Sequence, residues 1–277
     1  MTAADAAVGT VAWARRLGAA AVAGLCVGVL GGLIGLGGAE FRLPLLIGVF
    51  GFVALQAVIV NKAMSLIVVA TALPARLAEL PLGDVAEHWW VVVNLLAGSA
   101  LGAWLGASWA TRMASWTLYR VLAGLLVLMA AALAANHVGT LPAADLPPSA
   151  QVPFGVLAGV AIGVVAAIMG VAGGELLIPT IVLLYAVDIK LAGSLSLAVS
   201  LPTMLVAFAR YSRDGSFRVL RANRSFVVAM ALGSIAGTAL GGLLLGVVSA
   251  AIVVPLLVAL LLASSVKVWH HQASWCR

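Results

Sequence analysis

The chain has 277 residues, of which 64% are hydrophobic and only 9% are charged. Its 15 lysines and arginines against 9 aspartates and glutamates give a formal net charge of +6. An average soluble domain is about 25% charged, so this composition excludes a soluble globular enzyme, a disordered chain and a disulfide scaffold. It indicates an all-α polytopic membrane protein, whose helices each need about 20 apolar residues.

Ten hydrophobic segments follow one another along the chain. The sequence predicts helices over residues 17–38, 41–53, 57–76, 88–110, 116–136, 153–173, 176–187, 191–210, 224–246 and 249–268. Segments 41–53 and 176–187 are short. A helix of about 13 residues reaches only about 20 Å, which is less than the hydrocarbon thickness. The sequence is compatible with either a crossing or a re-entrant course for these two segments.

The second half of the chain repeats the first at a spacing of 135 residues. Glu40 and Pro44 correspond to Glu175 and Pro179, and the stripe Gly98, Gly102 and Gly106 corresponds to Gly233, Gly237 and Gly241. Biased composition would not readily match two glutamates inside apolar runs. We therefore predict a first transmembrane repeat over 1–136, a linker over 137–151 and a second transmembrane repeat over 152–277. Glycine stripes of this spacing predict close helix packing.

Basic residues in the loops predict the orientation, because cytoplasmic loops are enriched in lysine and arginine. Arg15 and Arg16 precede the first segment, and five arginines cluster in the stretch 210–224. The loop 77–88 carries acidic residues and no lysine or arginine. Corresponding loops thus fall on opposite sides, which predicts an inverted-topology repeat with both termini cytoplasmic. The arginine cluster is interpreted as a topology anchor, with binding of lipid headgroups or regulators as the alternative.

A glycine-rich break precedes each short segment. In both breaks, glycines are followed by a glutamate and, four residues later, by a proline. Glycine weakens a helix, and proline suits the first turn of the next one. We therefore expect the first long helix to end near Gly37-Gly38, and a short helix to begin near Glu40 or Phe41. Irregular backbone at membrane depth is tolerated only beside protein or a water-filled cavity, so two breaks in an inverted repeat predict a central binding site.

Candidate substrate-binding residues lie in and around these breaks. Helix N-termini attract anions, and Arg42 and Lys62 add positive charge, although either could instead form a salt bridge or extend toward an interface. Polar pairs on segments 57–76 and 191–210 share a helix face, with bonding to their own backbone as the alternative. The candidates are Gly37, Gly38, Glu40, Arg42, Asn61, Lys62, Ser65, Gly173, Gly174, Glu175, Ser194, Ser196 and Ser200.

Glu175 and Glu40 are also the candidates for proton coupling. An ionised carboxylate is costly in apolar surroundings, and its protonated form costs less. The alternatives are that they cap the short helices, or pair with Arg42 or Lys62. Arg42 is close to Glu40 in sequence, whereas Glu175 has Leu177 at the equivalent position. Glu175 is therefore the better proton carrier and Glu40 the better structural partner.

These features resemble the TauE/SafE family of sulfite exporters and anion permeases. The doubled glycine-rich break with proline carries the resemblance, together with the stretch 190–198. The chain departs from the family's frequent run of three glycines, with Gly37-Gly38-Ala39-Glu40 and Ala172-Gly173-Gly174-Glu175. The resemblance implies transport of a small anion of the sulfite, sulfoacetate or thiosulfate type, driven by an ion gradient across a bacterial inner membrane.

We therefore expect a secondary active transporter of a small organic or sulfur-containing anion, coupled to a proton or a sodium ion. The alternative is a passive anion channel or a structural membrane protein. An intramembrane enzyme is disfavoured because all four histidines lie at or near segment ends. No catalytic residue, metal site, cofactor or nucleic-acid partner is expected. The expected partners are the small anionic substrate, the coupling ion and the lipid bilayer.

Overall fold

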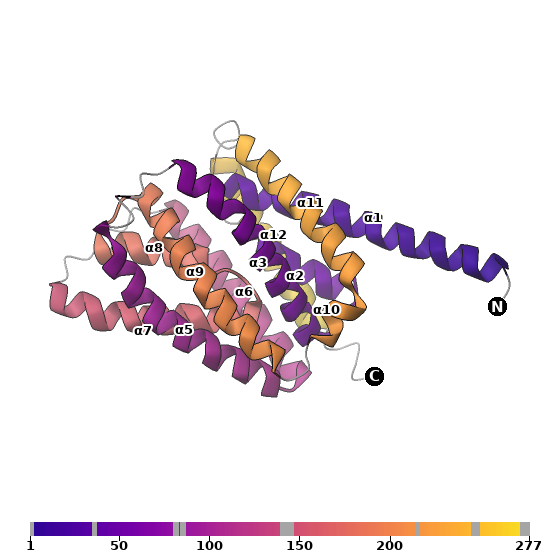
Figure 1. Cartoon of the computed structure of the whole chain (residues 1–277), viewed down its shortest axis with the longest axis horizontal. Coiled ribbons are helices and arrows are strands. Elements are labelled where there is room, and N and C mark those ends of the chain that lie inside the picture. Colours follow the sequence, from indigo (N-terminus) through magenta and orange to yellow (C-terminus); the bar gives the residue numbers. More distant parts are fainter. Residues whose placement is uncertain are drawn as a thin grey trace.

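The computed structural model describes residues 3–34, 38–79, 83, 87–138, 147–213, 217–244 and 250–271 (Figure 1). Its helices are α1 (Ala3–Ile34), α2 (Ala39–Gly48), α3 (Ala54–Glu79), α5 (Trp89–Arg112), α6 (Ser115–Val138), α7 (Pro148–Met169), α8 (Gly174–Tyr185), α9 (Ile189–Ser212), α10 (Arg218–Ala222), α11 (Arg224–Leu243) and α12 (Ala250–His271). None of these described residues lies in a strand.

The helix lengths confirm the prediction of an all-α polytopic membrane protein. Among the described residues, seven helices are long and apolar enough to cross a membrane, namely α1, α3, α5, α6, α7, α9 and α11. Helix α2 has 10 residues and α8 has 12. At about 1.5 Å per residue, neither short helix spans the hydrocarbon thickness on its own.

Some helix boundaries differ from those predicted. Helix α1 begins at Ala3, well before the predicted residue 17, and its described part runs to Ile34. Residues 35–37, which include Gly37, lie outside the described part of the chain. The five-residue helix α10 was not predicted, because so short an element leaves no periodic pattern in the sequence.

The position of the two prolines also differs from the prediction. Pro44 and Pro179 lie in the second turn of their helices and not in the first. The reason is that α2 and α8 begin directly after glycines in the left-handed conformation, Gly38 at φ 68° and Gly173 at φ 84°. Each proline lacks the N–H that would bond the carbonyl four residues earlier, which is the carbonyl of the preceding glutamate.

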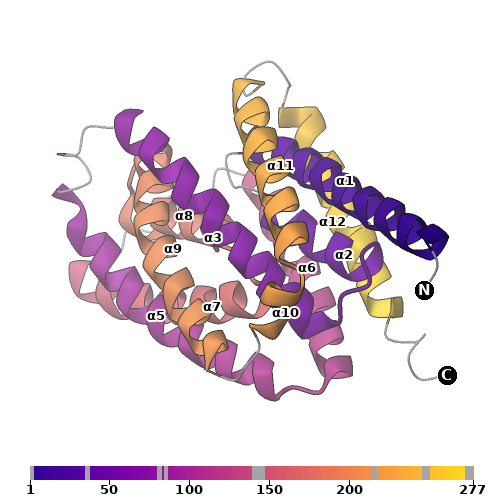
Figure 2. The ribbon, with the colours of Figure 1, turned by 45° about the vertical axis from the view of Figure 1, so that its right-hand side comes forward.

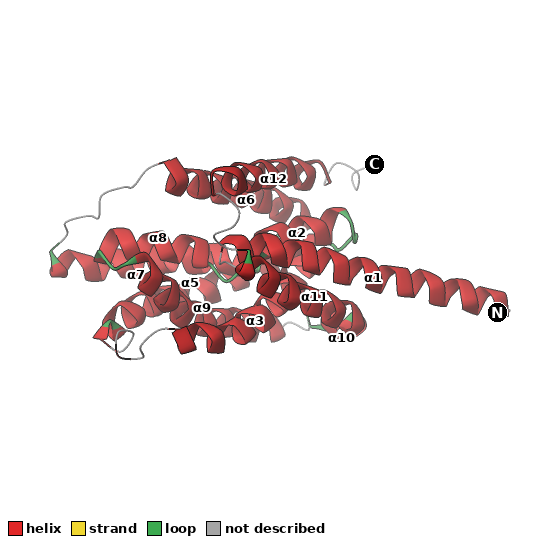
Figure 3. Cartoon of the chain, turned by 90° about the horizontal axis from the view of Figure 1, so that it is seen from above, coloured by secondary structure: helices red, strands yellow, loops and turns green. Residues whose placement is uncertain are grey.

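The short helices lie between two layers of longer ones. Viewed from above, α6 and α12 lie on one side of the molecule and α3 and α9 on the other, with α2 and α8 between them (Figure 3). The contacts agree, because α2 packs against α12 and α3, while α8 packs against α6 and α9. Leu43, Leu46 and Ile47 of α2 and Ile181 of α8 are fully buried. The helices that are too short to cross are thus enclosed by protein.

Two helix pairs join the halves of the chain, α1 with α11 and α5 with α7 (Figure 2). Their glycines meet the backbone of the partner helix at positions that repeat with the spacing of 135: Gly24 with Met230, Gly28 with Ser234, Gly159 with Leu95 and Gly163 with Ser99. The contact positions rise together along both members of a pair, so the paired helices run parallel. The predicted packing role of the glycine stripes is confirmed.

Replacing Gly102 with alanine should therefore destabilise the protein. An added Cβ would overlap the carbonyl oxygen of Val160 on α7, and overpacking of this kind costs about 1–3 kcal/mol. Gly124 is the matched control, because nothing lies near its added Cβ. Gly124→Ala should be neutral or stabilise by up to about 1 kcal/mol, the helix-propensity difference. Thermal unfolding in one detergent compares the two variants, and equal shifts would contradict the packing role.

Candidate functional site

The second break is a short non-helical stretch between α7 and α8. Helix α7 ends at Met169, and Gly170 follows in the left-handed conformation at φ 71°. Gly173, at φ 84°, then starts α8, whose first residue is Gly174. Both conformations strain any residue with a side chain, so the glycines fix where the helix stops and restarts. In the first break, Gly38 at φ 68° has the position equivalent to Gly173.

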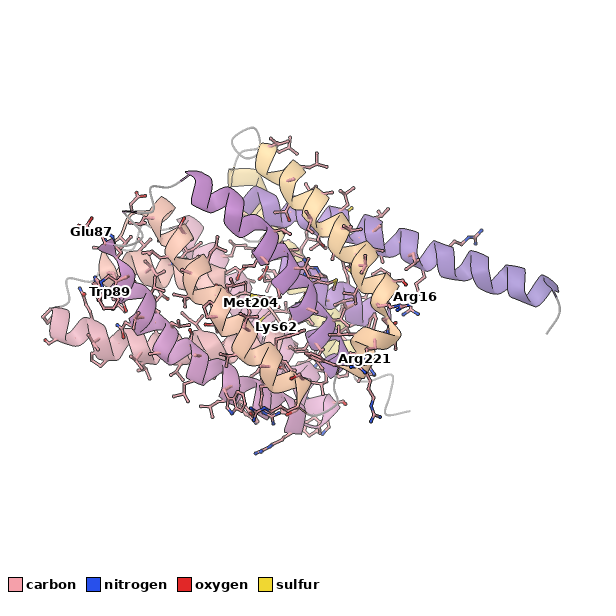
Figure 4. The ribbon with its side chains drawn as sticks, viewed as in Figure 1. Arg16, Lys62, Glu87, Trp89, Met204 and Arg221 are labelled. Carbon is pink, nitrogen blue, oxygen red and sulfur yellow. The ribbon has the colours of Figure 1, made fainter. Side chains whose placement is uncertain are left out.

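Lys62 of α3 forms hydrogen bonds at the C-terminal end of α7. Its side chain is fully buried, and its Nζ donates to the carbonyl oxygens of Ala166 at 2.9 Å and Val171 at 2.7 Å. The carbonyls at the end of a helix carry negative partial charge, which favours a nearby cation. The ammonium of Lys62 adds a second donor to Ala166, which already accepts from the N–H of Val171, and supplies a donor to Val171 just beyond the helix. Figure 4 shows Lys62 in the middle of the molecule, far from either end.

Asn61 and Ser65 connect the second break to the beginning of α2. Asn61 Nδ2 donates to the carbonyl of Met169 at 3.1 Å and to that of Ala39 at 3.0 Å. The guanidinium Nη1 of Arg42 donates to Asn61 Oδ1 at 3.5 Å and to Ser65 Oγ at 3.4 Å. Arg42 is fully buried. The guanidinium of the first half is therefore held by the same side chains that cap the helix of the second half.

Glu40 and Glu175 meet where α2 and α8 begin. Their carboxyl groups lie within hydrogen-bonding reach of each other, and the charge of Arg42 lies near Glu40. Glu40 is 4% exposed, and Glu175 is partly exposed although both its carboxylate oxygens are buried. Neither of those oxygens, nor Glu40 Oε1, accepts a hydrogen bond from the N–H or O–H of another described residue. The two carboxyls can therefore bond each other only if one carries a proton.

The serines of α9 are buried but do not join this network. Ser196 Oγ donates to the carbonyl of Gly193 at 2.7 Å, which is the backbone alternative weighed for such hydroxyls. Ser194 Oγ and Ser200 Oγ are buried and have no partner among the described residues. Their part in substrate binding remains a prediction. Leucines at 177 and 197 replace the cations Arg42 and Lys62, so the polar contacts come mainly from the first half.

The structure thus brings most of the predicted residues into one central region. Those joined by the contacts described above are Gly38, Glu40, Arg42, Asn61, Lys62, Ser65, Gly173, Gly174 and Glu175. Gly37 lies outside the described residues. Within the described parts of the chain, no group of three or more His, Cys, Asp or Glu side chains could hold a metal ion.

Tyr211 is a central residue that sequence reasoning missed. It is fully buried, and its hydroxyl donates to the carbonyl of Ala167 at 3.1 Å, near the end of α7. Its neighbours Arg210 and Arg213 indicated an interfacial position, where tyrosine is common. The sequence held no signal that this ring turns inward.

Comparison with known families matches the chain to one described as Sulfite exporter TauE/SafE, over residues 5–133 and 154–275. No curated protein and no solved structure matches the chain. The family match therefore covers most of both halves.

Replacing Lys62 with methionine should destabilise the protein. The substitution leaves the carbonyl of Val171 without its donor, whereas that of Ala166 keeps the backbone N–H of Val171. A buried unsatisfied polar group costs about 1–3 kcal/mol. Leu197→Met is the matched control, because it places methionine at the equivalent position of α9, where no such bonds exist. This apolar exchange should cost less than about 1.5 kcal/mol. Thermal unfolding in detergent measures both, and a Lys62→Met shift no larger than that of Leu197→Met would contradict the capping role.

Proposed function

We propose that this chain, which belongs to the TauE/SafE sulfite exporter family, is a secondary active transporter of a small anion. The observation that carries the proposal is the meeting of two helix breaks beside buried charged groups. Breaks in the two halves of a chain are a common way in which transporters build a central site. The family is one of membrane transporters, and the seven helices long enough to cross a membrane fit that activity.

The chemistry around Arg42 favours a small oxyanion as substrate. A guanidinium presents several donors to oxygen atoms, and two of its present acceptors are the neutral side chains of Asn61 and Ser65. The first turns of α2 and α8 add partial positive charge. An anion of the sulfite, sulfoacetate or thiosulfate type could replace one of these neutral acceptors. The unpaired hydroxyls of Ser194 and Ser200 would offer it further donors.

The two halves would lie in the membrane with opposite orientations, in a bacterial inner membrane. Figure 1 supports this, because α1 and α7, which correspond in the repeat, run in opposite directions. Figure 4 places Arg16 and Arg221 at one end of the molecule and Glu87 and Trp89 at the other. The arginine-rich end would face the cytoplasm. Both termini would then be cytoplasmic, and the site around Lys62 would lie between the two surfaces.

Anion uptake into liposomes tests the transport function. The purified protein should take up radiolabelled thiosulfate with saturation and only when an ion gradient is imposed. Arg42→Gln should reduce the rate at least about tenfold, because a bond to a charged group contributes about 1.5–3 kcal/mol. Arg218→Gln is the control, because Arg218 is exposed, and it should transport like the unmodified chain. Flux that neither saturates nor requires a gradient would instead identify a passive channel.

Cysteine labelling tests the opposite orientation of the halves. Cys26 and Cys276 are first replaced with serine, and single cysteines are then introduced at Glu87 and Arg218, both of which are exposed. A membrane-impermeant maleimide applied to spheroplasts should label position 87. Position 218 should react only after the membrane is permeabilised. Labelling of both positions from one side would contradict the proposed topology.

A further inference from the structure

We propose that Glu40 and Glu175 hold a single proton between them, and that this shared proton is the ion coupled to anion movement. The second clause rests on the proposed transport function, whereas the first concerns the protein alone. The sequence suggested two separate roles, with Glu175 as the carrier and Glu40 as a structural partner. The contact between their carboxyl groups unites the two residues in one site.

The geometry of the pair favours a shared proton. The two carboxyls are within hydrogen-bonding reach of each other, yet Glu40 Oε1 and both oxygens of Glu175 are buried and accept no bond from the N–H or O–H of another described residue. Two ionised carboxylates in such a place would repel each other, and the single charge of Arg42 can offset only one of them. One proton converts that repulsion into an O–H···O⁻ bond, which is among the stronger hydrogen bonds. Carboxyl pairs of this kind titrate as a unit rather than as separate residues.

The surrounding charges favour one proton over two. Arg42 lies close to Glu40 and stabilises one negative charge in the pair. The N-termini of α2 and α8 act in the same direction. Lys62 instead bonds the carbonyls of Ala166 and Val171 at the end of α7.

Of the other described ionisable groups on or beside the helices packed against α2 and α8, Arg15 and Cys26 of α1 and Asp188 before α9 are exposed, and the rest have contacts elsewhere. These contacts are Arg16 with Phe52 and Phe226, Tyr119 with Ala54, Arg120 with Trp116 and Trp269, Tyr185 with Asn94, Arg210 with Ser108, Tyr211 with Ala167, Lys267 with Gly48, and His270 in a groove with Trp269. Arg42 is thus the described cation that acts on the pair.

The shared proton links the site to an anion through its charge. Arg42 together with two ionised glutamates gives a net charge of −1, which repels an anion. With one proton in the pair the sum is zero, and that repulsion is removed. Proton binding and anion binding therefore favour each other, and this linkage is reciprocal.

Infrared difference spectroscopy tests the shared proton on the purified, detergent-solubilised protein without any substrate. The unmodified chain should show a protonated carboxyl band that disappears in one step as the pH rises. Glu40→Gln and Glu175→Gln should each abolish that same band, because each leaves a single carboxylate that accepts a bond from the new amide. Glu87→Gln is the control, because Glu87 is exposed, and it should leave the band unchanged.

Different outcomes separate the two clauses of the proposal. A band lost in Glu175→Gln but retained in Glu40→Gln would overturn the shared site and leave Glu175 as a lone carrier. A band displaced by sodium chloride but not by choline chloride at constant pH would show that the pair takes sodium, which also overturns the proposal. If a glutamine variant does not fold, the one-step titration and the sodium experiment on the unmodified chain still decide. If the infrared results hold but liposomes take up no thiosulfate, the shared proton stands and the proposed transport function falls.

Discussion

Helix α7 stops inside the protein, and the need to satisfy its last carbonyls governs the centre of the structure. Backbone groups at membrane depth cannot turn to water, so another part of the chain must supply the donors. Lys62, Asn61 and Ser65 do so from a single helix, α3. That helix must pass close to the break, and Gly170 permits it, because an added Cβ there would overlap the carbonyl of Val58. The break, the approach of α3 and the position of Arg42 are therefore one arrangement.

The two halves share their packing but not their electrostatics. The glycine contacts of α1 with α11 recur in α7 with α5, so the backbones of the halves approach each other in equivalent ways. The cations Arg42 and Lys62 have leucines as their counterparts, and α9 offers only serine hydroxyls. Equivalent backbone packing in the two halves thus encloses an asymmetric site. Any anion bound there would have the positive charge of the protein on one side and neutral hydrogen-bond donors on the other.

The sequence predicts what depends on local pattern and misses what depends on distant partners. The lengths of the apolar runs predict the helices, and the repeat predicts that the glycine stripes pack. The sequence locates each break to within a few residues. It places Pro44 and Pro179 in the first helical turn, whereas they lie in the second, because each short helix begins directly after a left-handed glycine. Lys62 could not be assigned, because its two acceptors lie 104 and 109 residues further along the chain. Nothing in an apolar stretch tells which carbonyls a lysine will meet.

The groups that stabilise negative charge in the carboxyl pair are also those that would bind an anion. Two unit charges about 4 Å apart interact with about 4 kcal/mol at an effective dielectric constant near 20. A helix N-terminus contributes only about 0.3–1 kcal/mol. One buried guanidinium can therefore balance one carboxylate of the Glu40–Glu175 pair, but not both carboxylates and a substrate as well. A bound anion would interact with Arg42 in place of one carboxylate of the pair. Without that cation beside it, the carboxylate is more stable protonated than ionised. Competition for a single cation is thus sufficient to link a proton to an anion, without a large movement of the helices.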